Sequence, residues 1–465
     1  MKKDRRSAPH EKLIKRMRWY RKVFLEGDIY TKLSFFIMGA SNIARGQIVK
    51  GISYLILELS FIFYLFQSGI NDLTGLITLG TKEQQMVYND AKGIYEVIKG
   101  DNSMIMLLLG ITAIFIIFFF AIVWKANLKS AMTAQEYKLK GKKAPGIIAD
   151  IKSLFDSNLH KLLLLIPIIG LIITTVLPLF YMILMAFTNY NMTHQPPGKL
   201  FTWVGLENFK IMLMSADKLG YTFWRIFEWT LIWAVMATFS NYFLGMFLAI
   251  LINSKGIKGK GFWRTVFVVS VAVPSFVTLL IIRIMMNDHG ALNILLMELG
   301  FTTKSIPFFS NPDIARVTVI LVNLWIGIPH TMLITTGILV NIPPELYESA
   351  RIDGAGPVKS FFHITMPYMI FITTPYLITN FIFNINNFNA IYFLTGGGPS
   401  TLDYFKGAGK TDLLVTWLYR LTVDSWDYCY AATIGIVIFL ISATGSLIVY
   451  RKSASYRKEE EFSNG

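Results

Sequence analysis

The chain has 465 residues, of which 54% are hydrophobic and 16% are charged, and its formal net charge is +15. This composition is too apolar for a soluble protein of that length, and the basic residues alternate with apolar runs, which argues against a nucleic-acid partner. Cys429 is the only cysteine, which excludes an intrachain disulfide and a thiolate metal cage. We therefore expect an all-α polytopic membrane protein in contact with lipid, with no metal site and no cofactor.

Apolar runs long enough to cross a bilayer as helices recur along the chain. They predict eight transmembrane helices, at residues 48–66, 104–124, 162–187, 227–252, 265–286, 317–340, 369–394 and 429–450. The apolar segment 33–43, at about 11 residues, is too short to span, so we expect it to be interfacial or half-inserted. Glu58 lies within the first span, where we favour a satisfied helix–helix contact within the accessory hairpin, partnered or protonated, over a functional carboxylate.

Lysine and arginine are concentrated in the segments on one side of this predicted membrane. Those segments are the N-terminus, 125–161, 255–264, 341–368 and the tail after residue 450. Because positive loops stay inside, we expect that side to be cytoplasmic, with both termini in the cytoplasm and the chain in the cell membrane as a multi-pass protein. The segments 67–103, 188–226, 287–316 and 395–428 are then extracellular.

The spacing of the spans predicts the organisation of the chain. It consists of a basic cytoplasmic N-terminus with the interfacial segment (1–47), an accessory transmembrane hairpin (48–124), a basic cytoplasmic linker (125–160), a six-helix core (161–450) and a cytoplasmic tail (451–465).

The cytoplasmic loop 341–368 has the composition of two short helices separated by a break. The pair Pro343-Pro344 can start a helix, acidic residues near its N-terminus suit the helix dipole and offer charge to a basic partner, and Gly354, Gly356 and Pro357 interrupt it. The loop also contains Glu348-Ser-Ala350, three residues, a glycine, nine residues and then Ile364-Thr-Met-Pro367.

This spacing closely resembles the EAA motif of ABC importer membrane subunits, with Ser349 for alanine and Met366 for leucine. The resemblance implies a loop that couples the chain to a separate ATPase, because the chain itself would carry no ATPase site. The implied coupling residues are Glu345, Glu348, Ser349, Ala350, Asp353, Gly354, Gly356, Pro357, Ile364 and Pro367. The plain alternative is a solvated amphipathic loop.

From about residue 160 onward the chain also resembles the larger permease subunit of maltose/maltodextrin-type carbohydrate importers. The matching stretches include Val204-Gly-Leu-Glu-Asn-Phe209, Ala272-Val-Pro-Ser275-Phe and Leu394-Thr-Gly-Gly-Gly-Pro399. The resemblance implies a type I ABC importer permease core. Its implied partners are a second homologous permease subunit, two ATP-binding cassette ATPase subunits, an extracellular sugar-binding protein and a carbohydrate substrate.

Asparagines at i, i+4 and i+7 form a stripe in the seventh predicted span, namely Asn380, Asn384 and Asn387. Amides in hydrocarbon need partners, so the stripe must face protein or a polar cavity. The pattern alone supports sugar binding and interhelical hydrogen bonding equally. The resemblance favours sugar contacts there, and it adds Ser275, Asn323 and Gly327. The chain departs from the maltose-type pattern at Val271 and Asn380, so the resemblance does not specify the sugar.

These features predict the permease subunit of an ABC importer that moves a carbohydrate, such as maltose, maltodextrin or a related oligosaccharide, across the cytoplasmic membrane. The alternative is a secondary sugar carrier driven by an ion gradient, which would need an internal repeat or titratable residues along its path. A membrane scaffold would leave the motif spacing and the asparagine stripe unexplained.

Overall fold

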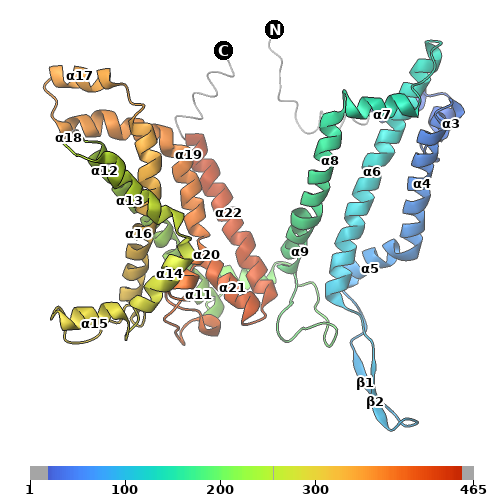
Figure 1. Cartoon of the computed structure of the whole chain (residues 1–465). Helices are drawn as coiled ribbons and strands as arrows, with labels where there is room; N and C mark the ends of the chain where they lie inside the picture. Colours follow the sequence, from blue (N-terminus) through green and yellow to red (C-terminus); the bar gives the residue numbers. More distant parts are fainter. Residues whose placement is uncertain (1–18, 255, 453–465) are drawn as a thin grey trace. The chain divides into compact units, whose positions relative to one another are not determined.

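The computed structural model describes residues 19–254 and 256–452 (Figure 1). The basic residues before Trp19 and the tail from residue 453 onward, which contributed to the predicted orientation, lie outside this range. Most of the described residues are helical, and the two named strands form one hairpin, which confirms the all-α class. It divides into two compact units. Unit 1 runs to Leu184 and includes Thr193–Trp203, and unit 2 comprises Met185–Met192 and the chain from Val204 onward.

Unit 1 contains long apolar helices joined by short elements. They are α2 (Ile29–Leu33), α3 (Ala40–Ala44), α4 (Ile48–Tyr64), the π-helical turn η1 (Leu65–Gly69), α5 (Ile70–Thr78), β1 (Gln85–Asn89), β2 (Ile94–Ile98), α6 (Ser103–Leu139), α7 (Ile147–Phe155), α8 (Leu159–Leu171), the π-helical turn η2 (Ile172–Val176) and α9 (Leu177–Met185). Helices α8 and α9 form one apolar stretch, Leu159–Met185, which is grouped mostly with unit 1 although the sequence assigned it to the core.

The short apolar segment predicted at 33–43 folds onto α4 and α6 through its backbone. Glu58 of α4 accepts a hydrogen bond from the backbone N–H of Met38 at 2.8 Å. Asn127 of α6 accepts one from Gly39 N–H at 2.9 Å, and Trp124 donates one to the backbone carbonyl of Phe35 at 3.1 Å. Glu58 is therefore satisfied, as expected, but by the backbone of this segment and not by the second helix of the hairpin.

The antiparallel hairpin β1–β2 joins α5 to α6 and was not predicted. Its base is closed by the carboxylate of Asp101, which accepts hydrogen bonds from the backbone N–H groups of Thr81 (2.7 Å) and Lys82 (3.0 Å). These bonds hold the pKa of Asp101 below its ordinary value because they stabilise the charged form.

Unit 2 contains the described helices and turns from α10 onward. They are α10 (Glu207–Met214), α11 (Lys218–Val235), the π-helical turn η3 (Met236–Ser240), α12 (Asn241–Asn253), α13 (Lys260–Ala272), α14 (Ser275–Met285), α15 (Ala291–Glu298), α16 (Pro312–Leu339), α17 (Pro344–Ile352), α18 (Pro357–Ser360), the π-helical turn η4 (Phe361–Thr365), α19 (Met366–Ile385), α20 (Phe388–Leu394), the 3₁₀ turn η5 (Phe405–Gly407), α21 (Leu414–Val423) and α22 (Tyr428–Lys452).

The described residues contain seven helices long and apolar enough to cross a membrane, and one further helix pair, α13 and α14, bent by 88°. The predicted eight spans are reached only if that pair counts as one. The fifth predicted span is thus broken at Pro274, whose ring and missing N–H end the first helix. The prediction of one continuous helix over 369–394 is wrong, because α19 ends at Ile385 and α20 begins at Phe388.

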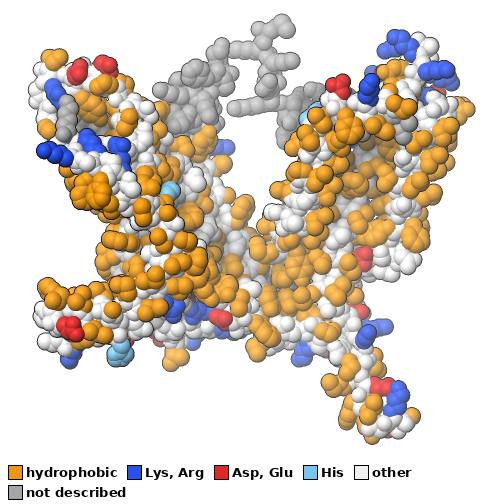
Figure 2. Space-filling model, in the orientation of Figure 1, with side chains coloured by type: hydrophobic (Ala, Val, Ile, Leu, Met, Phe, Trp, Pro, Cys, Tyr) orange, Lys and Arg blue, Asp and Glu red, His pale blue; other side chains and the backbone are white. Residues whose placement is uncertain are grey.

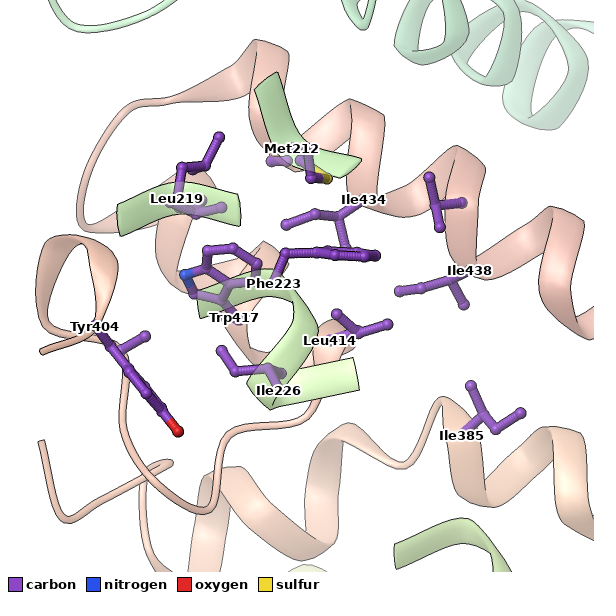
Figure 3. Packing of buried hydrophobic residues seen from close by; sticks show 14 of the residues in the cluster. Met212, Leu219, Phe223, Ile226, Ile385, Tyr404, Leu414, Trp417, Ile434 and Ile438 are labelled. Carbon is purple, nitrogen blue, oxygen red and sulfur yellow. The ribbon is translucent and has the colours of Figure 1, made fainter. Parts of the chain in front are cut away.

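Buried aromatic and aliphatic side chains hold α11, α21 and α22 together at one end of unit 2. Figure 3 shows Phe223 of α11, Trp417 of α21 and Ile434 of α22 gathered in one cluster. Along the remaining length, α12 packs against α16 and α11 against α19. Hydrophobic side chains cover the flanks of the helices, whereas charged side chains lie mainly near the helix ends and in the connecting loops (Figure 2). This distribution suits helices that meet lipid along their sides.

Candidate functional site

The loop between α16 and α19 has the predicted form of two short helices with a break. Helix α17 begins directly after Pro343, and Glu345 lies in its first turn. Gly354, just after the helix, adopts a φ of +75°, a left-handed conformation that favours glycine. Pro357 then opens α18.

The surface of this loop combines acidic and apolar side chains. None of the α17 residues is buried, and Glu345, Glu348 and Asp353 are exposed. Ile352 is 87% exposed and Val358 is 71% exposed, so apolar groups lie uncovered beside the carboxylates. Of the other predicted coupling residues, Ala350 and Ile364 are half-buried, whereas Ser349, Gly354, Gly356, Pro357 and Pro367 are exposed.

One side-chain contact ties α17 to the beginning of the transmembrane helix α19. The Tyr347 hydroxyl and Thr365 Oγ1 lie 2.8 Å apart and form a hydrogen bond. Thr365 is 5% exposed and ends the π-helical turn η4, which runs directly into α19. A displacement of α17 can therefore reach α19 through this bond as well as through the chain.

Two of the predicted sugar-contacting asparagines meet at the break between α19 and α20. Asn384 donates from Nδ2 to Thr238 Oγ1 of η3 at 3.0 Å, and its Oδ1 accepts from Asn387 Nδ2 at 3.4 Å. Asn387 in turn accepts from Ala390 N–H and so caps α20. Because the helix ends between them, Asn387 does not continue the face of Asn380 and Asn384, so the predicted i, i+4, i+7 stripe on one helix is wrong.

The remaining predicted positions lie on other elements of unit 2. Asn323 is half-buried and lies one helical turn before Gly327 on α16, so both face the same side. Asn380 is half-buried, and Ser275 is exposed at the first position of α14. The structure joins Asn384 with Asn387, whereas Asn380 and Ser275 form no hydrogen bond with them in the described part of the chain.

Sequence reasoning missed Asn241, which begins α12 and packs against Gly327. A Cβ atom built on Gly327 would lie 2.7 Å from Asn241 Oδ1, closer than real contacts allow, so glycine is needed there while Asn241 keeps this position. The signal in the sequence was a lone amide within the apolar run 227–252.

An apolar cavity of about 530 Å³ lies between α11, α19 and α22, but it does not include the predicted sugar contacts. Side chains such as Leu231, Phe381 and Ile441 line it. A hydroxyl-rich ligand would lose its hydrogen bonds there, so this cavity does not suit a sugar. Among the described residues, no group of three or more His, Cys, Asp or Glu side chains could hold a metal ion.

Residues 241–457 match the family described as binding-protein-dependent transport system inner membrane component. The maltodextrin transport system permease protein MalC of Streptococcus pneumoniae is 33% identical over 433 residues, which cover 91% of this chain and 95% of that protein. The chain belongs to this family of ABC importer permeases.

A second relative agrees with this family, and one solved structure contains a chain with the same fold. The permease is 33% identical to the galactooligosaccharides transport system permease protein GanP of Bacillus subtilis over 425 residues, which cover 91% of the permease and 97% of GanP. A bacterial alginate ABC transporter, solved with a periplasmic protein that binds an alginate pentasaccharide, contains a chain with the same fold. The TM-score is 0.50 and the identity 21%, over 66% of the permease and 97% of that chain.

Family membership fixes the general role of the permease. It is a multi-pass membrane protein and a transporter subunit, not itself an enzyme. ABC importer permeases work with ATPase subunits and a periplasmic binding protein.

The glycine-rich loop between α20 and α21 of the permease is held by a buried carboxylate. Asp412 accepts hydrogen bonds from Gly409 N–H at 2.7 Å and Thr416 Oγ1 at 2.9 Å, and it lies 3.6 Å from Arg420. Burial raises the pKa of Asp412, and the Arg420 guanidinium opposes that shift. Gly397 has a φ of +83°, and a Cβ there would overlap the Asp412 carboxylate. These contacts of Asp412 therefore hold the loop in one conformation.

Proposed function

We propose that this permease carries an oligosaccharide of the maltodextrin or a related class into the cell, with energy from ATPase subunits that dock on the loop 341–368. The observation that supports this proposal most is the sequence similarity to permeases named for maltodextrins and for galactooligosaccharides, each 33% identical over 91% of the chain. The two relatives are equally similar, so the proposal extends to oligosaccharides as a class. The chain forms the complex with a second homologous permease, two ATPase subunits and an extracellular sugar-binding protein.

The orientation proposed is that both termini, the loop 341–368 and the segment 125–160 face the cytoplasm. The distribution of lysine and arginine supports this orientation. It also puts the exposed acidic and apolar surface of α17 where an ATP-hydrolysing partner is available.

The coupling residues proposed are the ten residues that the motif resemblance implied above. Exposed Ile352 and Val358 supply apolar contact area, and Glu345, Glu348 and Asp353 supply charge for a basic surface on the ATPase. The bond between Tyr347 and Thr365 then transmits the motion of α17 to α19, whose far end carries Asn384.

The substrate path proposed includes Ser275, Asn323, Gly327, Asn380, Asn384 and Asn387. Amides donate and accept hydrogen bonds at once, as sugar hydroxyls do. Asn384 now bonds Thr238, so sugar binding at Asn384 requires this contact to exchange. Two rings of α20, Phe388 and Tyr392, stack with centroids 4.6 Å apart and offer an aromatic surface near the same break.

ATP-dependent uptake in proteoliposomes tests this proposal. The complex is isolated through a tag on this chain, and uptake of labelled maltodextrins and galactooligosaccharides is measured with and without ATP. We expect uptake to require ATP and to be lost in Glu348→Lys while the complex still assembles. Glu298→Lys on α15, an exposed carboxylate outside the coupling loop, is the matched control and retains uptake. Uptake that needs no ATPase subunit and follows an ion gradient would replace this proposal with the secondary carrier.

A further inference from the structure

Asn241 lies between two groups of proposed substrate contacts, namely the asparagines at the α19–α20 break and the pair Asn323 and Gly327 on α16. It directly follows the π-helical turn η3, a type of irregularity that is frequent at functional sites. Three residues earlier on the same segment, Thr238 accepts the hydrogen bond from Asn384. On its other side, the Asn241 amide packs against Gly327 of α16. One segment thus connects the α19–α20 break to the Asn323 and Gly327 face.

The hydrogen-bonding state of Asn241 is unusual for a buried amide. Its side chain is 5% exposed, and Oδ1 has no hydrogen-bond partner among the described residues. Asn323, one turn before Gly327 on the same face, has a buried Nδ2 that likewise lacks a partner there. A buried amide group left unpaired loses the hydrogen bonds that it makes with water, so two such groups in one region favour a ligand that satisfies both.

The chemistry of the two unpaired atoms is complementary to a hydroxyl group. Asn241 Oδ1 is an acceptor and Asn323 Nδ2 is a donor. A hydroxyl can donate its proton to the first and accept from the second, and neighbouring hydroxyls of one sugar ring can do the same in pairs. A purely apolar ligand, or water-free packing, leaves both atoms unpaired.

We propose that Asn241 is a specificity-determining residue of the carbohydrate path, which accepts a hydrogen bond from a sugar hydroxyl while Asn323 donates one. In the present conformation its amide fills the space beside Gly327. A shift of α12 against α16 exposes Oδ1 to the substrate. This inference rests on the proposed function, because it concerns the same path.

Transport kinetics of Asn241 variants test the proposal in the assembled complex. Asn241→Ala removes the acceptor, and Asn241→Ser keeps a smaller one. We expect Asn241→Ala to raise the KM for the preferred oligosaccharide about tenfold, the equivalent of one hydrogen bond, with a smaller change in kcat. The preference between maltodextrins and galactooligosaccharides should change as well, and Asn241→Ser should recover part of it.

A compensating pair of substitutions tests the packing of Asn241 against Gly327 separately from the proposed role of Asn241 in sugar binding. Gly327→Ala alone should impair assembly, because the added Cβ meets the Asn241 amide, and Asn241→Ala in the same chain should restore assembly by removing that amide. Asn208→Ala is the matched control. It removes a buried amide that bonds the carbonyls of Ala186 and Thr188 in a loop, and we expect it to leave sugar preference unchanged.

Each outcome decides the proposal. A changed KM or sugar preference in either assembled Asn241 variant supports it. Unchanged KM and preference for every sugar in both variants overturn it, and Asn241 is then a packing residue. If the wild-type complex takes up no oligosaccharide with ATP, the proposed function itself fails, and the wild-type measurement shows this before any variant is compared.

Discussion

The hydrogen bond between Tyr347 and Thr365 provides a direct test of how the loop acts on the transmembrane helices. Tyr347→Phe removes one hydroxyl and keeps the ring. The bond is 2.8 Å long and Thr365 is 5% exposed, so its loss also leaves a buried hydroxyl without this partner. A neutral hydrogen bond contributes about 1 kcal/mol, and an unpaired buried group costs up to about 3 kcal/mol. We therefore expect the contact between α17 and η4 to weaken by about fivefold to 150-fold.

The appropriate assay measures sugar uptake and ATP hydrolysis in the same proteoliposomes. We expect Tyr347→Phe to assemble normally, since the exposed acids of α17 are intact, and to transport less sugar for each ATP hydrolysed. Thr365→Ala should give the same loss. Because both variants break one bond, the double variant should be no worse than either single variant.

Two results would refute this reasoning. An unchanged ratio of transport to hydrolysis in Tyr347→Phe would mean that the bond carries no motion. Additive losses in the double variant would mean that Tyr347 and Thr365 act through separate contacts.

Three further predictions concern other parts of the chain. Gly397→Ala should disrupt the loop between α20 and α21, because its Cβ overlaps the Asp412 carboxylate. We propose that this loop, on the extracellular side, contacts the binding protein, so we expect weaker association with that protein in a pull-down, while Gly396→Ala has less effect. Hydrogen bonds hold the pKa of Asp101 below its ordinary value of 3.8, so their contribution is present above that pH and is lost as the pH falls through the lowered value. The protection of the hairpin-base amides from hydrogen exchange, relative to the intrinsic exchange rate at each pH, should therefore decrease as the pH falls below 3.8, and Asp101→Asn should abolish this dependence. Glu58→Leu leaves the Met38 N–H without its acceptor and should lower the stability of unit 1 by about 1–3 kcal/mol, whereas Glu58→Gln should cost less; thermal unfolding in detergent measures both.

The elements that could be predicted from the sequence are those set by local chemistry. Long apolar runs gave most of the spans, and proline and glycine gave the break in the coupling loop at Gly354 and Pro357. Proline within the apolar run 265–286 also carried the signal for the break at Pro274, where two helices meet at a bend of 88°.

The parts that were missed depend on contacts between distant segments. Asn384 finds its partner Thr238 146 residues earlier in the chain, and Asn241 meets Gly327 on another helix. A periodic stripe assumes a continuous helix, whereas the amide of Asn387 caps a new one. The hairpin was missed because each strand has only 5 residues and most of its side chains are exposed, so no buried face imposes a clear alternation.

The docking of the segment after α2 onto α4 and α6 has an evolutionary consequence. Glu58, Asn127 and Trp124 each bind a main-chain group of that segment, and none of these bonds depends on which side chain the segment carries. Substitutions at Met38 or Phe35 therefore preserve the bonds, whereas substitutions at the three receiving side chains break them. Homologous permeases that keep this arrangement should vary at Phe35 but retain glycine at Gly39, where a Cβ would overlap the Gly51 backbone, and remain constrained on the two helices that hold the segment.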